Sequence, residues 1–260
     1  MQGRSMGGTP HDIDDITFEG PDGSSVEAFL VRPAWFAGDG DRVTGPAVLA
    51  WHWLDDRAPD GDRTQFLEEA AGWAGLGITS LLPQGRFPWK QPPVGAEHDR
   101  AAIVAEVGRV QAGLDRLVEE PGVDPSRLAV VGHDFGGMLA TVAAAREDRL
   151  RGLVVVAATP RWGDWLLPFW QIDEDRIDYL RALRPLDPIE CIRELHDIEI
   201  LFQFGSRDFY IAPMSAWELE RATADGSTSL TYDAEHDMRL AEIRADRLEF
   251  LVRVLGIPRP

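Results

Sequence analysis

The stretch Leu128–Gly137, with the sequence LAVVGHDFGG, decides the fold of this chain. Its first four residues form an apolar run typical of a buried strand, and the small residues of Met138–Ala145 favour a helix directly afterwards. Gly132 and Gly136 lie two positions either side of Asp134 and allow the sharp turn that such a direct connection needs. The sequence therefore predicts a strand, a tight turn and a helix, with one carboxylate at the apex.

Strands alternate with helices along the rest of the chain, which predicts an α/β fold with a mostly parallel eight-stranded sheet flanked by helices. Ile13–Glu19 and Val26–Arg32 are alternating segments joined by the hairpin signal Pro21–Gly23. Further strands are expected at Pro46–Trp51, Gly77–Leu82, Arg127–Val131, Leu153–Ala157, Ile198–Phe204 and Thr228–Tyr232. Helices are expected at Thr64–Leu76, Glu97–Glu120 and Arg239–Leu255. We expect a single domain over residues 1–260.

The interval 159–195 interrupts this alternation and is rich in aromatic residues, with a helical stretch near Ile177–Leu183. It is too short for a large cap domain, so we expect a small lid or a wall of a pocket. Aromatic side chains in this interval and in other loops predict either an aromatic-walled pocket for a small, fairly apolar substrate or ordinary core packing. The aromatic residues in question are Trp51, Trp53, Phe87, Trp89, Trp162, Trp165, Phe169 and Trp170, with Trp89, Trp162 and Trp165 the candidates for substrate contact.

Charge and composition exclude several classes of function. The 260 residues carry a formal net charge of −18, which disfavours a nucleic-acid or anionic-membrane partner. Cys191 is the single cysteine, so no intramolecular disulfide can form, and no His/Cys spacing indicates a metal site. The sequence contains no phosphate-binding glycine loop, so it does not imply a cofactor. The polar start Met1–His11 and the lack of a ~20-residue apolar run predict a cytoplasmic protein. The predicted pocket implies a small-molecule substrate as the partner, and the sequence leaves the oligomeric state open.

A nucleophile at the apex of such a turn needs a histidine to move protons and an acid to orient that histidine. Asp208 directly follows the predicted strand Ile198–Phe204, and His236 follows the last predicted strand, so both belong at the edge of the sheet that carries Asp134. Asp134 and Asp208 also have simpler interpretations, as a helix-capping and a turn residue. Alternatives for the acid and the histidine are Asp233, His52, His98, His133 and His196.

With nucleophile, acid and histidine in this order, the chain from about Ile13 to Leu255 resembles the α/β-hydrolase superfamily. The resemblance implies an oxyanion hole made by the backbone N–H of Phe135 and a second N–H from the loop after the third strand. Trp53 is the candidate for that second donor, and a shift of one residue gives Leu54 instead.

Two branches of the superfamily are similar to different parts of the chain. The turn Gly132–Gly137 resembles that of haloalkane dehalogenases and epoxide hydrolases, in which an aspartate attacks carbon and a histidine then activates water. The overall layout, with an N-terminal hairpin, a short lid and Glu235-His236 before the last helix, resembles dienelactone hydrolases, which use cysteine or serine at the turn.

The chain departs from the first branch at three points. His52-Trp53 stands where that branch has His-Gly, Phe135 replaces a halide-binding tryptophan, and the expected lid is small. Epoxide hydrolases hold the epoxide oxygen with two cap tyrosines. Here Tyr179 alone lies in the lid interval, with Tyr210 and Tyr232 elsewhere.

These observations lead to three hypotheses. The first is a hydrolase in which Asp134 forms a covalent ester, His236 activates water and Asp208 orients His236. The second is an ester or lactone hydrolase similar to dienelactone hydrolases, with Asp134 forming an anhydride or acting as a base. The third is a protein of this fold that binds a ligand and catalyses nothing.

Overall fold

The computed structural model describes residues 11–34, 44–53, 58–86, 92–168, 170–223 and 227–258. The described chain opens with strands β1 (His11–Glu19) and β2 (Ser25–Pro33), which pair antiparallel as the hairpin signal predicts. Strand β2 continues antiparallel onto β4 (Thr79–Pro83), so the hairpin forms one end of a larger sheet.

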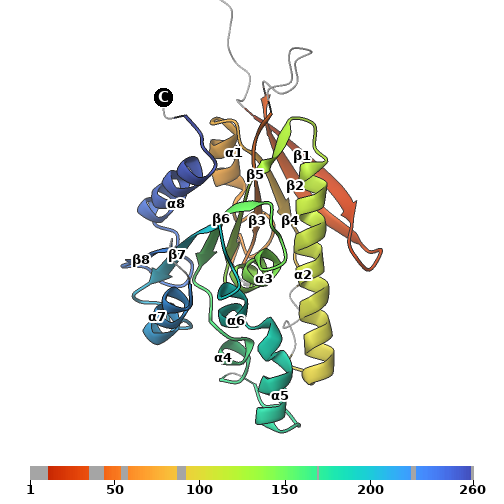
Figure 1. Cartoon of the computed structure of the whole chain (residues 1–260), viewed down its shortest axis with the longest axis vertical. Coiled ribbons are helices and arrows are strands. Elements are labelled where there is room, and N and C mark those ends of the chain that lie inside the picture. The colour runs from red at the N-terminus through yellow and green to blue at the C-terminus, as the bar shows by residue number, and fades with distance from the viewer. Residues whose placement is uncertain are drawn as a thin grey trace, which may run out of the picture.

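The described strands form one eight-stranded sheet in the order β1-β2-β4-β3-β5-β6-β7-β8 (Figure 1). All pairings from β4 to β8 are parallel, which confirms the predicted mostly parallel sheet. The remaining strands are β3 (Gly45–Trp51), β5 (Val123–His133), β6 (Leu150–Val156), β7 (Glu199–Gly205) and β8 (Ser227–Tyr232).

The register of the parallel strands brings their carboxyl ends together. Trp51 lies opposite Gly132, and His133 lies opposite Val156. At the far end of the sheet, Gly205 lies opposite Tyr232. The loops that follow β3, β5, β7 and β8 therefore leave the sheet at one edge, where open α/β sheets bind ligands.

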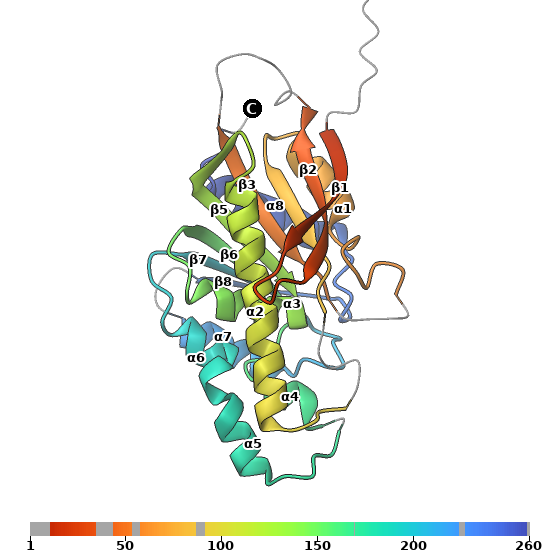
Figure 2. The same cartoon turned by 90° about the vertical axis from the view of Figure 1, so that its right-hand side faces the viewer.

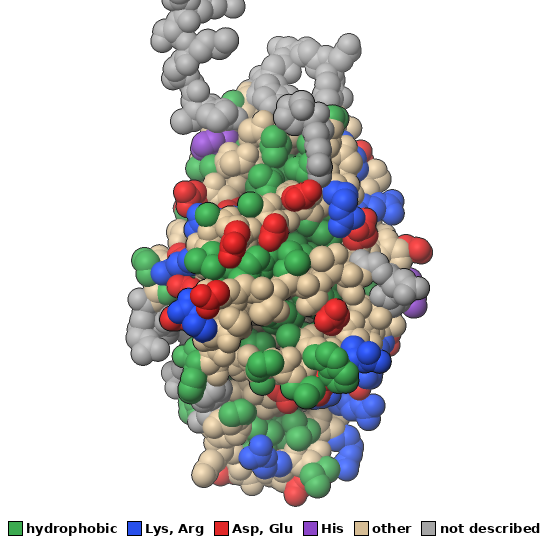
Figure 3. Space-filling model, turned by 90° about the vertical axis from the view of Figure 1, so that its left-hand side faces the viewer, with side chains coloured by type: hydrophobic (Ala, Val, Ile, Leu, Met, Phe, Trp, Pro, Cys, Tyr) green, Lys and Arg blue, Asp and Glu red, His purple; other side chains and the backbone are tan. Residues whose placement is uncertain are grey.

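Helices cover both faces of the sheet, with α2 and α3 on one face and α1 and α8 on the other (Figures 1 and 2). Their bounds are α1 (Leu67–Ala74), α2 (Ala96–Val118), α3 (Phe135–Ala144), α7 (Pro213–Ala222) and α8 (Ala241–Val254). The face that carries β8, α7 and α8 shows apolar side chains interspersed with charged ones (Figure 3).

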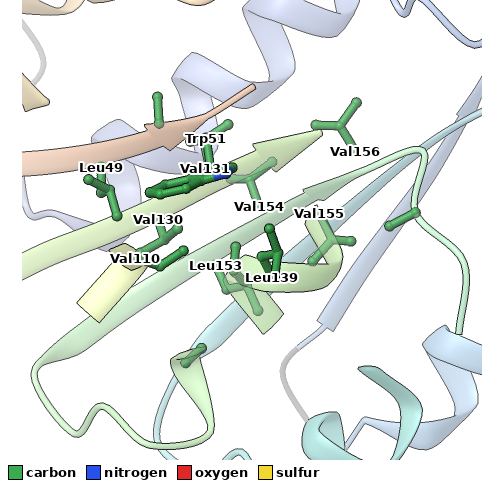
Figure 4. Close-up of a cluster of buried hydrophobic side chains, with 14 of the residues drawn as sticks. Leu49, Trp51, Val110, Val130, Val131, Leu139, Leu153, Val154, Val155 and Val156 are labelled. Atoms are coloured by element: carbon green, nitrogen blue, oxygen red, sulfur yellow. The ribbon is translucent and has the colours of Figure 1, made fainter. Parts of the chain in front are cut away.

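The main core lies between the sheet and α2 and α3 (Figure 4). Val130 and Val154 are fully buried in adjacent central strands, and Leu139 of α3 and Val110 of α2 pack over this region. Strands buried on both faces explain why β3, β4 and the second half of β5 read as continuous apolar runs and not as alternating patterns.

The interval 159–195 was predicted to form a lid or pocket wall, and its described residues form three short helices and one 3-10 turn. Helix α6 packs against α3 and α7, and α5 packs against the N-terminal part of the long helix α2. Tyr179 fixes this second contact, because its buried hydroxyl donates to Asp99 Oδ2 at 2.9 Å. The four elements are α4 (Trp162–Leu166), α5 (Arg176–Leu183), η3 (Arg184–Leu186) and α6 (Pro188–Ile192).

The start of helix α3 and the presence of helix α7 differ from the sequence predictions. Helix α3 begins at Phe135, three residues earlier than expected, because the two glycines of Gly136-Gly137 are helical and let the helix pack closely on the sheet. Helix α7 was not expected, because one leucine of its ten residues is buried and its apolar pattern is weak. Within the described residues, no helix combines the length and apolar character needed to cross a membrane.

Candidate active site

Asp134 occupies a strained turn between β5 and α3. Its backbone has φ +56° and ψ −124°, a region that residues with a side chain rarely adopt and that costs about 1–3 kcal/mol. The N–H of Asp134 donates to the Val156 carbonyl and its carbonyl accepts from the Met138 N–H, so both ends of the turn are held. This conformation lifts the Asp134 side chain away from the strand end, as the sequence predicts for the apex residue.

The glycines around Asp134 are required by close packing of backbone on backbone. A Cβ on Gly132 would lie 2.3 Å from the Gly136 carbonyl oxygen, and a Cβ on Gly136 would lie 2.4 Å from the carbonyl oxygens of Trp51 and His52. Neither glycine has a positive φ, so the strain is carried by Asp134 itself. The backbone of the turn therefore packs directly against the end of β3, which brings the loop after β3 next to Asp134.

The structure brings Asp134, His236 and Asp208 together. His236 Nδ1 lies 2.8 Å from Asp208 Oδ2, within hydrogen-bond distance, and His236 Nε2 lies 3.7 Å from Asp134 Oδ1. The other oxygen of Asp208 accepts from the N–H groups of Tyr210 and Ile211, which fixes the carboxylate in its loop. One imidazole thus lies between two carboxylates, each facing one of its nitrogens.

All three side chains are nearly removed from solvent. Asp134 and Asp208 have side chains 1% exposed, and the His236 side chain is 8% exposed. Burial by itself lowers the pKa of His236, but the carboxylates of Asp134 and Asp208 outweigh it and raise the pKa to about 9. At neutral pH the site therefore holds a positively charged imidazole between the two acids.

The alternatives considered from the sequence have other surroundings. Among them, His52 Nε2 accepts from the Gly85 N–H at 2.9 Å. The Asp233 side chain is 84% exposed and pairs with Arg207 at 2.7 Å, so it is not the acid that faces His236. His98 lies at the start of α2 beside Asp99, and His196 lies in the loop before β7. His133 is buried next to the site, and its role is described below.

Comparison with known proteins shows which fold this architecture shares. A model of the alpha/beta hydrolase fold family matches residues 122–190, which include β5, the Asp134 turn and α3. The acetyl xylan esterase from Paenibacillus sp. R4 is 17% identical, with a TM-score of 0.70, and the match covers 97% of this chain and 86% of that chain. The chain has the α/β-hydrolase fold.

Other proteins similar to this chain differ in the reactions that their names describe. A putative dienelactone hydrolase from Klebsiella pneumoniae is 15% identical with a TM-score of 0.64, covering 94% of this chain and 99% of that one. The uncharacterized peptidase YuxL of Bacillus subtilis is 22% identical over 204 residues, which is 75% of this chain and 30% of that protein. These relatives are named as hydrolases of several kinds, and the chain spans less than a third of the curated relative's length.

The predicted oxyanion donors lie on either side of the Asp134 turn. Phe135 is the first residue of α3, so its N–H belongs to the helix N-terminus, where backbone donors favour negative charge. The Trp53 N–H instead donates a hydrogen bond to Gln65 Oε1 at 2.8 Å, so this N–H already has an acceptor within the protein. Leu54, the alternative donor, lies outside the described residues. The roles of Phe135 and Trp53 as oxyanion donors stay predictions.

Aromatic rings surround His236. The Trp165 ring from α4 stacks on the His236 ring at 5.7 Å, and the Tyr210 ring meets it edge-on at 5.0 Å. The Trp53 ring lies 5.8 Å away on a further side. Trp165 also contacts Phe135 at 5.1 Å, so the interval 159–195 contributes directly to the walls around the site.

Trp162 and Trp89 are the other two aromatic residues that the sequence predicts to contact substrate. Trp162 is fully buried, stacks on Phe135 at 6.1 Å, and donates its indole N–H to the Leu186 carbonyl. It lies in the packed layer around Phe135 and joins α4 to the turn before α6. Trp89 lies outside the described residues. Contact of either residue with a substrate stays a prediction.

A solvent-open cavity of about 590 Å³ reaches the site through His236. Two arginines line it, but Arg207 pairs with Asp233 and Arg239 pairs with Asp60 at 2.6 Å. The cavity walls include Trp53, Arg207, Phe209, Tyr210, His236 and Arg239. Its volume lies within the range of small-molecule sites.

Sequence reasoning missed two residues of this site. Tyr210 packs on His236, and its position two residues after Asp208 in the same loop was the signal that could have placed it. Gln65 reaches the site from the turn before α1 and bonds to both Trp53 and His133, and no pattern in the sequence indicates that contact. Among the described residues, no group of three His, Cys, Asp or Glu side chains could hold a metal ion.

Proposed function

We propose that the protein is a hydrolase in which the Asp134 carboxylate attacks carbon and forms a covalent ester that His236 and water then cleave. The observation that carries this proposal is the position of Asp134. It lies on a strained turn, with an oxygen 3.7 Å from His236 Nε2 while His236 Nδ1 is hydrogen-bonded to Asp208. A helix-capping aspartate would accept from the first N–H groups of α3, and no such side-chain bond is made.

In the first step, an Asp134 oxygen forms a bond to a substrate carbon as the bond to the leaving group breaks. The leaving group departs with the electron pair of that bond, and Asp134 becomes a neutral ester. The strained turn supports this step, because it holds the carboxylate in one orientation before substrate binds and so reduces the entropy lost on reaching the transition state.

In the second step, His236 acts as a base for water. Esterification removes the Asp134 charge, one of the two that raise the pKa of His236, so that pKa falls and the imidazole releases its proton to the departing group or to solvent. Neutral His236 Nε2 then takes a proton from water as the water oxygen attacks the ester carbonyl carbon. Collapse of this intermediate breaks the bond between the carboxyl carbon and the alkyl-bearing oxygen, and the departing alkoxide takes the proton back from His236. The product thus carries an original Asp134 oxygen, and the water oxygen stays on Asp134.

The surroundings favour a small, uncharged substrate. Trp53, Trp165 and Tyr210 present aromatic surfaces around His236, and the two cavity arginines are already paired with acids. The net charge of −18 disfavours the approach of an anion. Haloalkanes and epoxides fit these conditions better than haloacids do.

The experiment that tests this proposal traps the ester. The His236→Gln variant is mixed with a panel of haloalkanes, haloacids, epoxides, esters and lactones, and the intact-protein mass is recorded and any adduct mapped. Without its base the protein should accumulate a stable adduct on Asp134, while His98→Gln, an exposed-histidine control, should turn substrate over like the wild type. Absence of any adduct, together with an inactive wild type, would favour a ligand-binding protein without catalysis.

A second candidate function is hydrolysis of esters or lactones by a water molecule that His236 activates as the base and that Asp134 only positions as a hydrogen-bond acceptor. The 3.7 Å separation between His236 Nε2 and Asp134 Oδ1 favours it, because a water molecule could hydrogen-bond to both atoms. Turnover of aryl esters that survives Asp134→Asn but is abolished by His236→Ala would support this second mechanism and exclude the covalent one for those substrates.

A further inference from the structure

His133, the residue before the proposed nucleophile, is bonded to the backbone of His236. Its ring is 1% exposed, and its Nε2 lies 2.8 Å from the His236 carbonyl oxygen. A carbonyl oxygen can only accept a hydrogen bond, so Nε2 carries the proton and donates. His133 therefore hydrogen-bonds to the backbone of His236, while the side chain of His236 faces Asp134 and Asp208.

The second nitrogen of His133 completes a chain of bonds across the site. With the proton on Nε2, Nδ1 accepts, and the Gln65 side-chain nitrogen lies 2.6 Å from it. The Gln65 oxygen in turn accepts from the Trp53 N–H at 2.8 Å. Hydrogen bonds thus run in one direction from Trp53 through Gln65 and His133 to the His236 carbonyl.

Ring packing holds His133 in the same orientation. The Trp53 ring stacks parallel on the His133 ring at 5.1 Å with an interplanar angle of 5°. Burial lowers the pKa of His133 well below its ordinary value, and the positive charge of His236 lowers it further, so His133 stays neutral. A neutral ring with one donor and one acceptor is what this chain of bonds requires.

The loop that carries His236 needs such a support. His236 lies outside any helix or strand, after β8, and its ring is held by the hydrogen bond to Asp208 and by the aromatic rings packed around it. The separation of 3.7 Å between His236 Nε2 and Asp134 Oδ1 leaves little tolerance, because a shift of the loop by about 1 Å changes which atoms Nε2 can reach.

The geometry points to His133 as a positioning residue, which with Gln65 fixes the His236 backbone so that Nε2 faces Asp134. This inference deepens the proposed function and rests on it, since it takes His236 as the base. It also gives a role to the buried hydrogen-bonding side chain directly before Asp134.

The test compares two conservative replacements of His133. A glutamine amide reaches about as far as imidazole Nε2 and can still donate to the His236 carbonyl, whereas an asparagine amide reaches only as far as Nδ1. We expect His133→Asn to lower kcat by about 10- to 100-fold with KM changed less than about twofold, and His133→Gln to stay within about threefold of wild type. Gln65→Met should lower kcat several-fold.

A second measurement separates this inference from the proposed function. The downfield proton signal of His236 Nδ1–H, bonded to Asp208, reports the position of His236 whether or not Asp134 forms an ester. That signal should move or broaden in His133→Asn and in Gln65→Met and stay in place in His133→Gln. An unmoved signal in His133→Asn, or equal kcat for the Asn and Gln variants, would overturn the positioning role. If His133→Asn does not fold, the Gln65→Met signal decides.

Discussion

His133 and His236 lie side by side at the edge of the sheet, with ring centroids 5.4 Å apart, and yet differ in charge, since His133 is neutral and His236 is protonated at neutral pH. Both are buried. His133 bonds to an amide and a carbonyl, and its pKa is lowered well below the ordinary value. His236 faces two carboxylates, and its pKa is raised to about 9.

The difference shows that burial alone does not set the charge of a histidine. Burial disfavours the charged form of both rings, but the carboxylates beside His236 offset that cost, while the neutral partners of His133 do not. The candidate site therefore holds one neutral ring, to which we assign a positioning role, and one charged ring, which we propose as the base. Changing the hydrogen-bond partners of either ring should therefore shift its pKa toward that of the other ring.

The largest effect is expected from Asp134→Asn, which gives His236 an uncharged neighbour. Loss of the nucleophile should reduce kcat by about 10⁵-fold or more on any substrate that reacts through the ester. Steady-state kinetics on the panel substrate that the wild type turns over fastest checks this. Asp233→Asn removes the same charge from an exposed position and should remain within about twofold of wild type.

Asp208→Asn should have the next largest effect, because it removes the charge that orients His236. An asparagine oxygen can still accept from the N–H groups of Tyr210 and Ile211, so the loop should keep its shape. We expect kcat to fall by about 10³- to 10⁴-fold with a small change in Tm, measured by kinetics and thermal unfolding. A loss of activity accompanied by a large fall in Tm would instead indicate loss of folding and would contradict the orienting role.

The third prediction concerns the charge of His236 directly. Titration followed by NMR should give a pKa of about 9 in the wild type, and a pKa lower by more than one unit in Asp134→Asn. The sign follows from the lost carboxylate, which stabilises the protonated ring. Equal pKa values in the two proteins would mean that Asp134 does not act on His236.

The smallest effect is expected from Gln65→Glu, which places a carboxylate beside His133 in the position that the amide occupies. The new charge should raise the pKa of His133, so its NMR signals should shift toward those of a protonated ring at neutral pH. Gln65→Met provides the uncharged control. Identical His133 signals in the two variants would show that its neutrality does not depend on its partner.

Much of the fold could be predicted from the sequence, because hydrophobic runs and turn residues carry the information locally. The hairpin, the parallel strands and the long helix α2 follow from these patterns within a few residues. Helix α7 was missed because its single buried side chain, Leu219, leaves too little apolar periodicity.

The site was predictable where chain order and strand ends determine it. Asp134, Asp208 and His236 each follow a strand whose carboxyl end lies at one edge of the sheet, so their meeting follows from topology. The bonds of Gln65 were not predictable, because a long side chain crosses from one loop to two others and leaves no periodic trace. The engagement of the Trp53 N–H by Gln65 was missed for the same reason.

The central claim is that Asp134 attacks the substrate, and a single turnover in ¹⁸O-labelled water tests it most directly. The protein is used in excess over the panel substrate that it converts fastest, and the product and an Asp134 peptide are analysed by mass. We predict unlabelled oxygen in the product and one ¹⁸O on Asp134. Label in the product of the first turnover, with none on Asp134, would contradict the account and assign the attack to water.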